Sequence, residues 1–161
     1  MPKIKYKKTL NLILIFSIFS LITAYFIQYV LSHQPCNLCL FERIPYVFVI
    51  IVTSLCLYLK KFEKNFLIIL SLIFFVAALL SFYHFGIEQG FFKESLVCNL
   101  GSHEKVFTTE ELLRELREKP ISCRNVTFRI LGFSLATINT LVSLILSIIT
   151  LSTYLNYEKK K

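Results

Sequence analysis

Long apolar blocks alternate with short polar segments along this chain. The blocks cover residues 10–31, about 44–59, 66–87 and 131–155. A helix needs roughly 20 apolar residues, within a range of about 17 to 25, to cross the hydrocarbon core of a bilayer. Three blocks are long enough alone, and the second is if it begins near residue 41 and carries Glu42 and Arg43 at its interface end. The pattern predicts an all-α membrane protein, a four-transmembrane-helix bundle over about 10–31, 41–59, 66–87 and 131–155.

The polar segments between these helices predict two loops on one side of the membrane, about 32–40 and 88–130, within a single membrane domain over 1–161. The longer loop contains one helix signal, because Thr108 followed by Glu111 is a capping box and Pro120 ends the segment. We expect a short amphipathic helix there, which either lies on the membrane or over a reactive site, or is a solvated surface helix.

Composition agrees with a membrane protein, since 55% of the 161 residues are hydrophobic. The basic start followed by an apolar run also resembles a secretory signal peptide. Its apolar run is longer than the usual signal core of about 7 to 15 residues, and no small-residue cleavage site closes it. We therefore expect the first block to be a retained helix.

Charge predicts the orientation of the bundle. The segments before the first helix, between the second and third, and after the fourth carry ten lysines against Glu63 and Glu158, which accounts for the whole formal charge of +8. Lys and Arg in short loops mark the cytoplasmic side. We expect both termini on the cytoplasmic side of the membrane and both cysteine-bearing loops on the outer side. Topology explains the basic charge, so membrane lipid rather than nucleic acid is the expected partner.

The cysteine pair Cys36 and Cys39 lies just before the second apolar block. A zinc site would need two more ligands. The candidates are Cys98, Cys123, His33, His84 and His103, but no second close ligand group is apparent. A static disulfide at this spacing closes a very small loop and stabilises little. A redox dithiol is the favoured interpretation, because Cys-x-x-Cys spacing and a nearby cation lower the pKa of a thiol. Arg43 would lie one helical turn after Cys39 and supply that cation.

Three further residues carry candidate chemistry. Cys98 and Cys123 lie in the longer loop, where they are either a structural staple or an exposed disulfide that exchanges with the first pair. His84 lies near the end of the third helix and is a functional candidate for its position. The remaining cysteine, Cys56, lies inside the second helix and is expected to be a core residue.

The chain resembles the disulfide bond formation protein B (DsbB-like) family of quinone-linked oxidoreductases over nearly its whole length. The resemblance rests on the segments Pro35-Cys36-Asn37-Leu38-Cys39 with Glu42-Arg43, Tyr83-His84, Cys98, Cys123 and Leu131-Gly132-Phe133-Ser134. It implies an enzyme that re-oxidises a periplasmic DsbA-like thioredoxin-fold protein and passes the electrons to ubiquinone or menaquinone of the respiratory quinone pool.

The resemblance also implies roles for individual residues. Cys98 and Cys123 would form the disulfide that the partner attacks, with Cys98 taking the mixed disulfide. Cys123 would then attack within the Cys36/Cys39 pair. Cys39 would be the thiolate that contacts quinone, and Arg43 and His84 would line the quinone pocket.

Two alternatives stay open at this point. A relative of the vitamin K epoxide reductases would use similar chemistry but places its Cys-x-x-Cys in a later helix. A non-enzymatic membrane protein with two structural disulfides would bind no quinone, and a change of Arg43 to Ala would then be silent.

Overall fold

Four long helices dominate the computed structural model, which describes residues 2–59, 63–94, 96–99, 122–124, 128–130 and 132–158. The elements in chain order are α1 (Pro2–Tyr29), α2 (Asn37–Phe41), α3 (Arg43–Leu59), α4 (Glu63–Glu88), the short 3₁₀ helix η1 (Leu96–Asn99), β1 (Arg129–Ile130), β2 (Phe133–Ser134) and α6 (Leu135–Glu158). The stretches long and apolar enough to cross a membrane are Tyr6–Tyr29, Asn37–Leu59, Lys64–Glu88 and Leu135–Asn156. The predicted all-α membrane fold with four spanning helices is confirmed.

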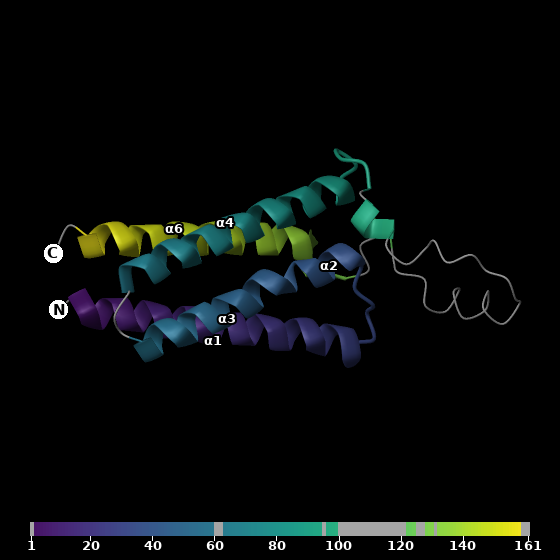
Figure 1. Cartoon of the computed structure of the whole chain (residues 1–161). Helices are drawn as coiled ribbons and strands as arrows, with labels where there is room; N and C mark the ends of the chain where they lie inside the picture. Colours follow the sequence, from purple (N-terminus) through teal and green to yellow (C-terminus); the bar gives the residue numbers. More distant parts are fainter. Residues whose placement is uncertain are drawn as a thin grey trace, which may run out of the picture.

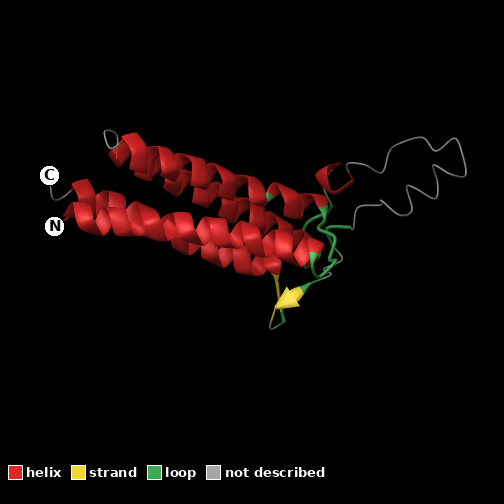
Figure 2. Cartoon of the chain, turned by 90° about the horizontal axis from the view of Figure 1, so that it is seen from below, coloured by secondary structure: helices red, strands yellow, loops and turns green. Residues whose placement is uncertain are grey.

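The four helices lie side by side as two pairs, α4 with α6 and α1 with α3 (Figure 1). The start of α1 and the end of α6 lie at the same end of the bundle, as an even number of spans requires. Helix α2, helix η1 and the small β1–β2 hairpin gather at the opposite end, here called the cysteine end (Figures 1 and 2). The described cysteines other than Cys56 lie there.

The outer surface of the bundle is apolar, whereas its interior contains small polar residues. Leu12, Phe19 and Phe48 are more than half exposed, as expected for side chains that face lipid rather than water. Ser71 and Ser147 are buried between α4 and α6, where the Ser71 hydroxyl donates to the Ser147 carbonyl at 3.2 Å and the Ser147 hydroxyl donates to the Ser71 carbonyl at 3.1 Å. Small residues allow two membrane helices to approach closely, and these hydrogen bonds join them.

The second spanning segment is divided into two helices. Cys36 caps α2, with its sulfur accepting a hydrogen bond from the backbone N–H of Cys39, and Glu42 separates α2 from α3. The segment therefore begins at Asn37 rather than near residue 41. The shorter outer loop, expected over 32–40, is helical in its last part for the same reason.

The fourth helix begins at Leu135, later than the expected start near residue 131. Strands β1 and β2 pair antiparallel there, with Ile130 opposite Phe133. Gly132 in the turn has a φ of 87°, a backbone conformation that favours glycine and is incompatible with a continuing helix. The amphipathic helix expected near Thr108 to Pro120 lies outside the described residues.

Candidate functional site

The Cys36/Cys39 pair occupies the start of α2 at the cysteine end. The two sulfur atoms are 2.9 Å apart and are not bonded to each other. Cys36 is buried and Cys39 is partly buried. Because Cys36 is the N-cap and Cys39 lies in the first turn, the helix itself sets the spacing of the two thiols.

Three hydrogen bonds converge on the Cys36 sulfur. Besides the backbone N–H of Cys39, it contacts the Cys39 sulfur and Nε2 of His84, the latter at 3.5 Å. The hydrogen bond with the Cys39 thiol contributes most to lowering the pKa of Cys36 to about 5; burial opposes this change, and the contact with His84 adds to it. A lowered pKa favours the thiolate, which is the reactive form in disulfide exchange.

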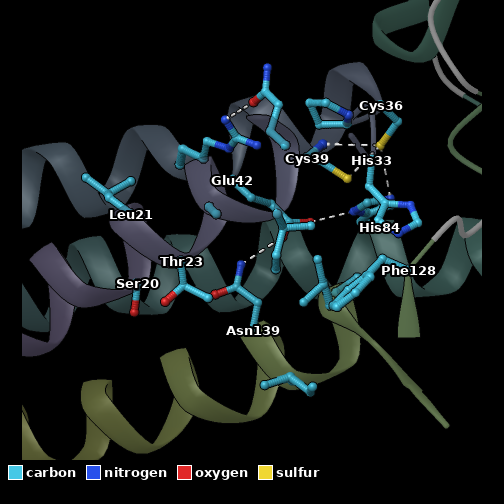
Figure 3. A pocket seen from close by; sticks show the side chains of 18 of the residues that line it. Ser20, Leu21, Thr23, His33, Cys36, Cys39, Glu42, His84, Phe128 and Asn139 are labelled. Carbon is cyan, nitrogen blue, oxygen red and sulfur yellow. Dashed lines mark hydrogen bonds and ion pairs between the residues drawn. The ribbon is translucent and has the colours of Figure 1, made fainter. Parts of the chain in front are cut away.

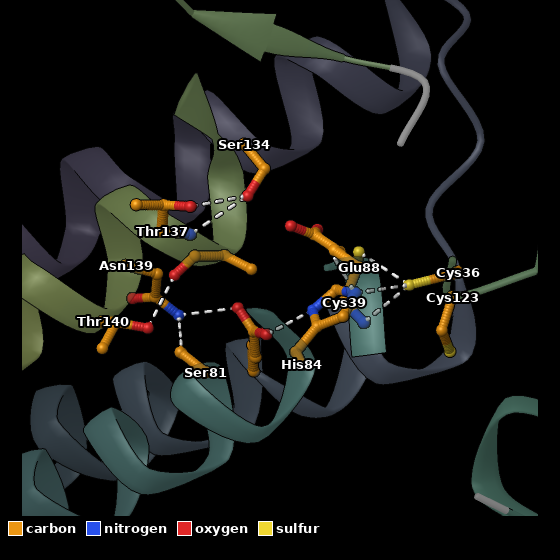
Figure 4. A network of polar contacts seen from close by, with 12 residues as sticks. Cys36, Cys39, Ser81, His84, Glu88, Cys123, Ser134, Thr137, Asn139 and Thr140 are labelled. Carbon is orange, nitrogen blue, oxygen red and sulfur yellow. Dashed lines mark hydrogen bonds and ion pairs between the residues drawn. The ribbon is translucent and has the colours of Figure 1, made fainter. Parts of the chain in front are cut away.

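A buried chain of polar side chains extends from Cys36 into the bundle (Figures 3 and 4). His84 on α4 contacts Glu42 through its second ring nitrogen, Nδ1, at 2.6 Å from Oε1. The other carboxylate oxygen of Glu42 accepts a hydrogen bond from the Asn139 amide on α6 at 2.7 Å. That amide also donates to Ser81, and its oxygen accepts from the Tyr46 hydroxyl at 2.5 Å. Glu42, which lies between α2 and α3, and residues of α3, α4 and α6 thus fix the orientation of the His84 ring.

The second cysteine pair forms a disulfide, Cys98–Cys123, with Cα atoms 5.8 Å apart. Both cysteines pack in one buried cluster with Cys36, Leu38 and Ile87, and Cys39 borders it. The fold therefore brings the two pairs together from separate loops. The expectation that the second pair is exposed is wrong for this arrangement, since Cys98 and Cys123 are only 3% and 2% exposed. The disulfide is therefore largely covered in this arrangement.

An apolar cavity of about 380 Å³ lies beside the first cysteine pair (Figure 3). Its walls come mainly from α1 and α6, and its polar edge includes Cys39, Glu42, Arg43 and His84. Apolar walls with a few convergent polar groups are typical of pockets for small organic molecules. The cavity would accept a flat aromatic ring with polar oxygens at the end where the cysteines lie.

Arg43 lies at the edge of this cavity. Its guanidinium donates to the Gln28 side chain at 2.6 Å and lies over the Tyr25 ring, 4.9 Å from the ring centroid. These two α1 residues hold Arg43 at the cavity wall, on the turn that follows Cys39. A guanidinium there offers fixed donors to an oxygen atom on a bound molecule.

The fold brings together Cys36, Cys39, Cys98, Cys123 and His84, and it places Arg43 at the cavity that they border. Cys56 lies apart, in the other core cluster, with its sulfur 2.6 Å from the Tyr6 hydroxyl. Sequence reasoning missed Asn139 and Glu88, and it treated Glu42 as an interfacial charge. Two features of the sequence could have indicated them: Asn139 is an amide within an apolar block, and Glu88 is a carboxylate four residues after His84.

Comparison with known proteins identifies a family. A family model described as "Disulfide bond formation protein DsbB" matches residues 6–153. A Rickettsia prowazekii (strain Madrid E) protein described as "Uncharacterized protein RP370" is 32% identical over 155 residues, and the alignment covers 94% of this chain and 90% of the relative. The matched region contains both cysteine pairs, Arg43, His84, the first three spanning stretches and most of the fourth.

Proposed function

Since this chain belongs to the DsbB family of disulfide bond formation proteins, which are membrane oxidoreductases, we propose that it is a thiol:quinone oxidoreductase. In this proposal it re-oxidises a periplasmic DsbA-like thioredoxin-fold protein and passes the electrons to ubiquinone or menaquinone. One observation carries the proposal: both cysteine pairs meet in one buried cluster, beside an apolar cavity bordered by Arg43 and His84.

The proposed exchange begins at the Cys98–Cys123 disulfide. A thiolate of the partner attacks the Cys98 sulfur, the bond to Cys123 breaks, and Cys123 leaves as a thiolate. Cys123 then attacks the Cys36 sulfur of an oxidised Cys36–Cys39 pair and releases Cys39 as a thiolate. The partner's second thiol resolves its bond to Cys98 and leaves the partner oxidised. The freed Cys98 thiolate then attacks Cys123, which breaks the Cys36–Cys123 bond, restores the Cys98–Cys123 disulfide and leaves Cys36 and Cys39 reduced. Shared burial of Cys36, Cys98 and Cys123 supports this order, because the reacting sulfurs need little chain movement to meet.

Quinone fits the cavity by its chemistry. It would lie with its ring against Cys39, its oxygen near Arg43 and its apolar tail along the cavity walls, and it supplies an acceptor for two electrons. Overall, one partner dithiol gives up two electrons and two protons to form a disulfide, and one quinone takes them up to form quinol. The groups of the chain bind and orient the ring, and the apolar walls exclude water from the reacting sulfurs.

His84 and Glu42 are the groups proposed to move the thiol protons. The imidazole faces the Cys36 sulfur through Nε2, and Glu42 holds its other nitrogen. An imidazole oriented by a carboxylate is a common arrangement in general acid–base catalysis. Asn139 and Ser81 fix the carboxylate in turn, so the ring stays aimed at the sulfur while protons are exchanged.

Quinone-dependent turnover tests this function. Purified full-length protein with a ubiquinone or menaquinone analogue is expected to oxidise a reduced thioredoxin-fold dithiol protein, and a Cys39→Ser variant is expected to fall to the background rate. Cys56→Ser is the matched control and should retain the wild-type rate, because Cys56 lies in the other core cluster.

The same assay distinguishes an enzyme from a protein with structural disulfides. If the disulfides were only structural, no quinone-dependent oxidation of the substrate would be measured, and Arg43→Ala would not change the result. A Cys39→Ser variant that oxidised the substrate as fast as wild type would refute the mechanism.

A further inference from the structure

Cys36, Cys39 and His84 place three metal-binding atoms together. Their donor atoms lie within 4.8 Å of one another, and no other such group of His, Cys, Asp or Glu occurs among the residues that the structure describes. The His84 Nε2 atom is 3.5 Å from the Cys36 sulfur. Zinc binds thiolate sulfur at about 2.3 Å and imidazole nitrogen at about 2.0–2.1 Å, so its ligands lie roughly 3.3–3.8 Å apart. The Cys36 sulfur and His84 Nε2 already lie within this range, whereas the two sulfurs, 2.9 Å apart, would have to separate to surround one ion.

The hydrogen bonds that orient His84 are of the kind found at zinc sites. A metal-bound histidine usually hydrogen-bonds a carboxylate through its other ring nitrogen, which fixes the ring and its tautomer. Here Nδ1 of His84 contacts the Glu42 carboxylate at 2.6 Å, and Nε2 is left facing the cysteines. Asn139 holds the other Glu42 oxygen at 2.7 Å. The imidazole is therefore oriented for binding before any ion arrives.

Glu88 supplies an independent indication of a missing ligand. Its side chain is 5% exposed, and its Oε1 lies 3.7 Å from Nε2 of His84. Its other oxygen, Oε2, is buried without a hydrogen-bond partner within the described part of the chain. A buried carboxylate oxygen without a partner costs free energy unless something binds it. Figure 4 shows Glu88 next to His84 and the two cysteines. Its carboxylate is not among the donor atoms that lie within 4.8 Å of one another, so it would reach a bound ion through a bridging water.

We propose that the reduced form of this site binds one Zn²⁺ ion through Cys36, Cys39 and His84, with a water held by Glu88 as the fourth ligand. Binding replaces two thiol protons with the metal, both sulfurs become thiolates, and no electrons move. A Cys36–Cys39 disulfide offers no thiolate, so the oxidised protein lacks the site. Bound zinc would hold the pair reduced and keep it from accepting electrons. The binding itself does not depend on the proposed quinone chemistry.

Zinc binding to purified full-length protein tests the inference without any activity measurement. The protein in detergent, reduced or oxidised, is titrated with Zn²⁺ alone against a chromophoric chelator, and bound metal per chain is counted. One Zn²⁺ is expected per reduced chain at this site and none per oxidised chain. His84→Ala and Cys36→Ser should each weaken binding more than 10-fold. Glu42→Gln, which alters the support of His84, should weaken it by about 10- to 100-fold.

Controls separate this site from the other thiols. The paired variant Cys98→Ser/Cys123→Ser and the single variant Cys56→Ser should bind zinc as tightly as wild type. Glu88→Gln is nearly isosteric, so it tests the fourth position even if other variants fold poorly, and it should weaken binding at least severalfold. The inference is overturned if reduced protein binds no zinc, if oxidised protein binds it equally, or if His84→Ala and Glu88→Gln both leave the affinity unchanged.

Discussion

At the level of single residues, the side chain of Asn139 connects three spanning segments. Its amide donates to Glu42 at 2.7 Å and to Ser81 at 2.6 Å, while its oxygen accepts from Tyr46 at 2.5 Å. Glu42 in turn contacts His84, which faces Cys36. We therefore regard Asn139 as a positioning residue, which acts on the sulfur chemistry through Glu42 and His84.

An Asn139→Leu variant is expected to lower quinone-dependent turnover by about 10- to 100-fold. Leucine has a similar size but leaves the Glu42 carboxylate without its amide partner, and a hydrogen bond to a charged group contributes roughly 1.5–3 kcal/mol. Each 1.36 kcal/mol corresponds to about a tenfold change in rate. Steady-state rates with a reduced dithiol substrate and a quinone analogue measure the effect.

Thr140→Val is the matched control for Asn139. The Thr140 hydroxyl donates to the Ala136 carbonyl of its own helix, so its loss should leave turnover near wild type. Asn139→Leu should also lower the thermal midpoint, because the buried Glu42 carboxylate loses a partner, so turnover is compared at a temperature at which both variants are folded. Equal turnover in Asn139→Leu and Thr140→Val would show that the network does not act on the reaction.

The sequence predicted the reactive residues, but not the hydrogen-bond partners that hold them in place. Cys36, Cys39 and Arg43 were recognisable because their chemistry depends on spacing within one helical turn. The link from Glu42 to Asn139 joins residues far apart in sequence, and such contacts follow from helix packing that no local pattern specifies. Glu88 could be placed four residues from His84, but its unpartnered oxygen could not be anticipated.

At the level of helices, the packing of α4 against α6 positions several residues of the site. His84 and Ser81 come from α4 and Asn139 from α6, so their distances depend on how closely these helices pack. Deeper in the bundle, the reciprocal hydrogen bonds of Ser71 and Ser147 join the same two helices. The serine pair therefore sets the helix spacing on which the polar network depends.

A Ser71→Leu variant is expected to lower the free energy of unfolding by about 1–3 kcal/mol, because the larger side chain must fit a closely packed interface. Ser71→Ala keeps the small size and should cost only about 0.6 kcal/mol, a typical value for a hydrogen bond between membrane helices. Unfolding by sodium dodecyl sulfate in mixed micelles measures both. Leu72→Ala is the control on the exposed face, since Leu72 is 58% exposed; an equal loss there would refute the packing argument.

Helix positions were predictable where the apolar pattern is long, and less so where the backbone changes direction. The apolar blocks located all four spans, because a bilayer requires continuous apolar length. The break at Glu42 and the hairpin around Gly132 were missed, since elements of five residues or fewer have no periodicity to read. These two features place Cys39 and Ile130 beside the cavity, so the missed irregularities belong to the site.

At the level of the whole molecule, the reactive groups occupy one end of the bundle and the chain termini the other (Figure 1). The cysteine pairs, His84 and the cavity share the cysteine end, while most lysines of the chain belong to the segments of the opposite end. Electron transfer from a periplasmic protein requires the cysteine end to face the periplasm. The orientation is therefore a condition for the proposed function and can be tested separately from it.

Reporter fusions are expected to place the terminal end of the bundle in the cytoplasm. The excess of lysine in short segments resists transfer across the membrane, and the opposite segments carry no net charge. A green fluorescent protein fused after Lys161 should fluoresce, and alkaline phosphatase at the same place should be inactive. Phosphatase fused after Glu94, beyond the end of α4 at the cysteine end, should be active. The reverse pattern would put the cysteines in the cytoplasm, where a periplasmic thiol partner could not reach them, and the proposed function would fail with it.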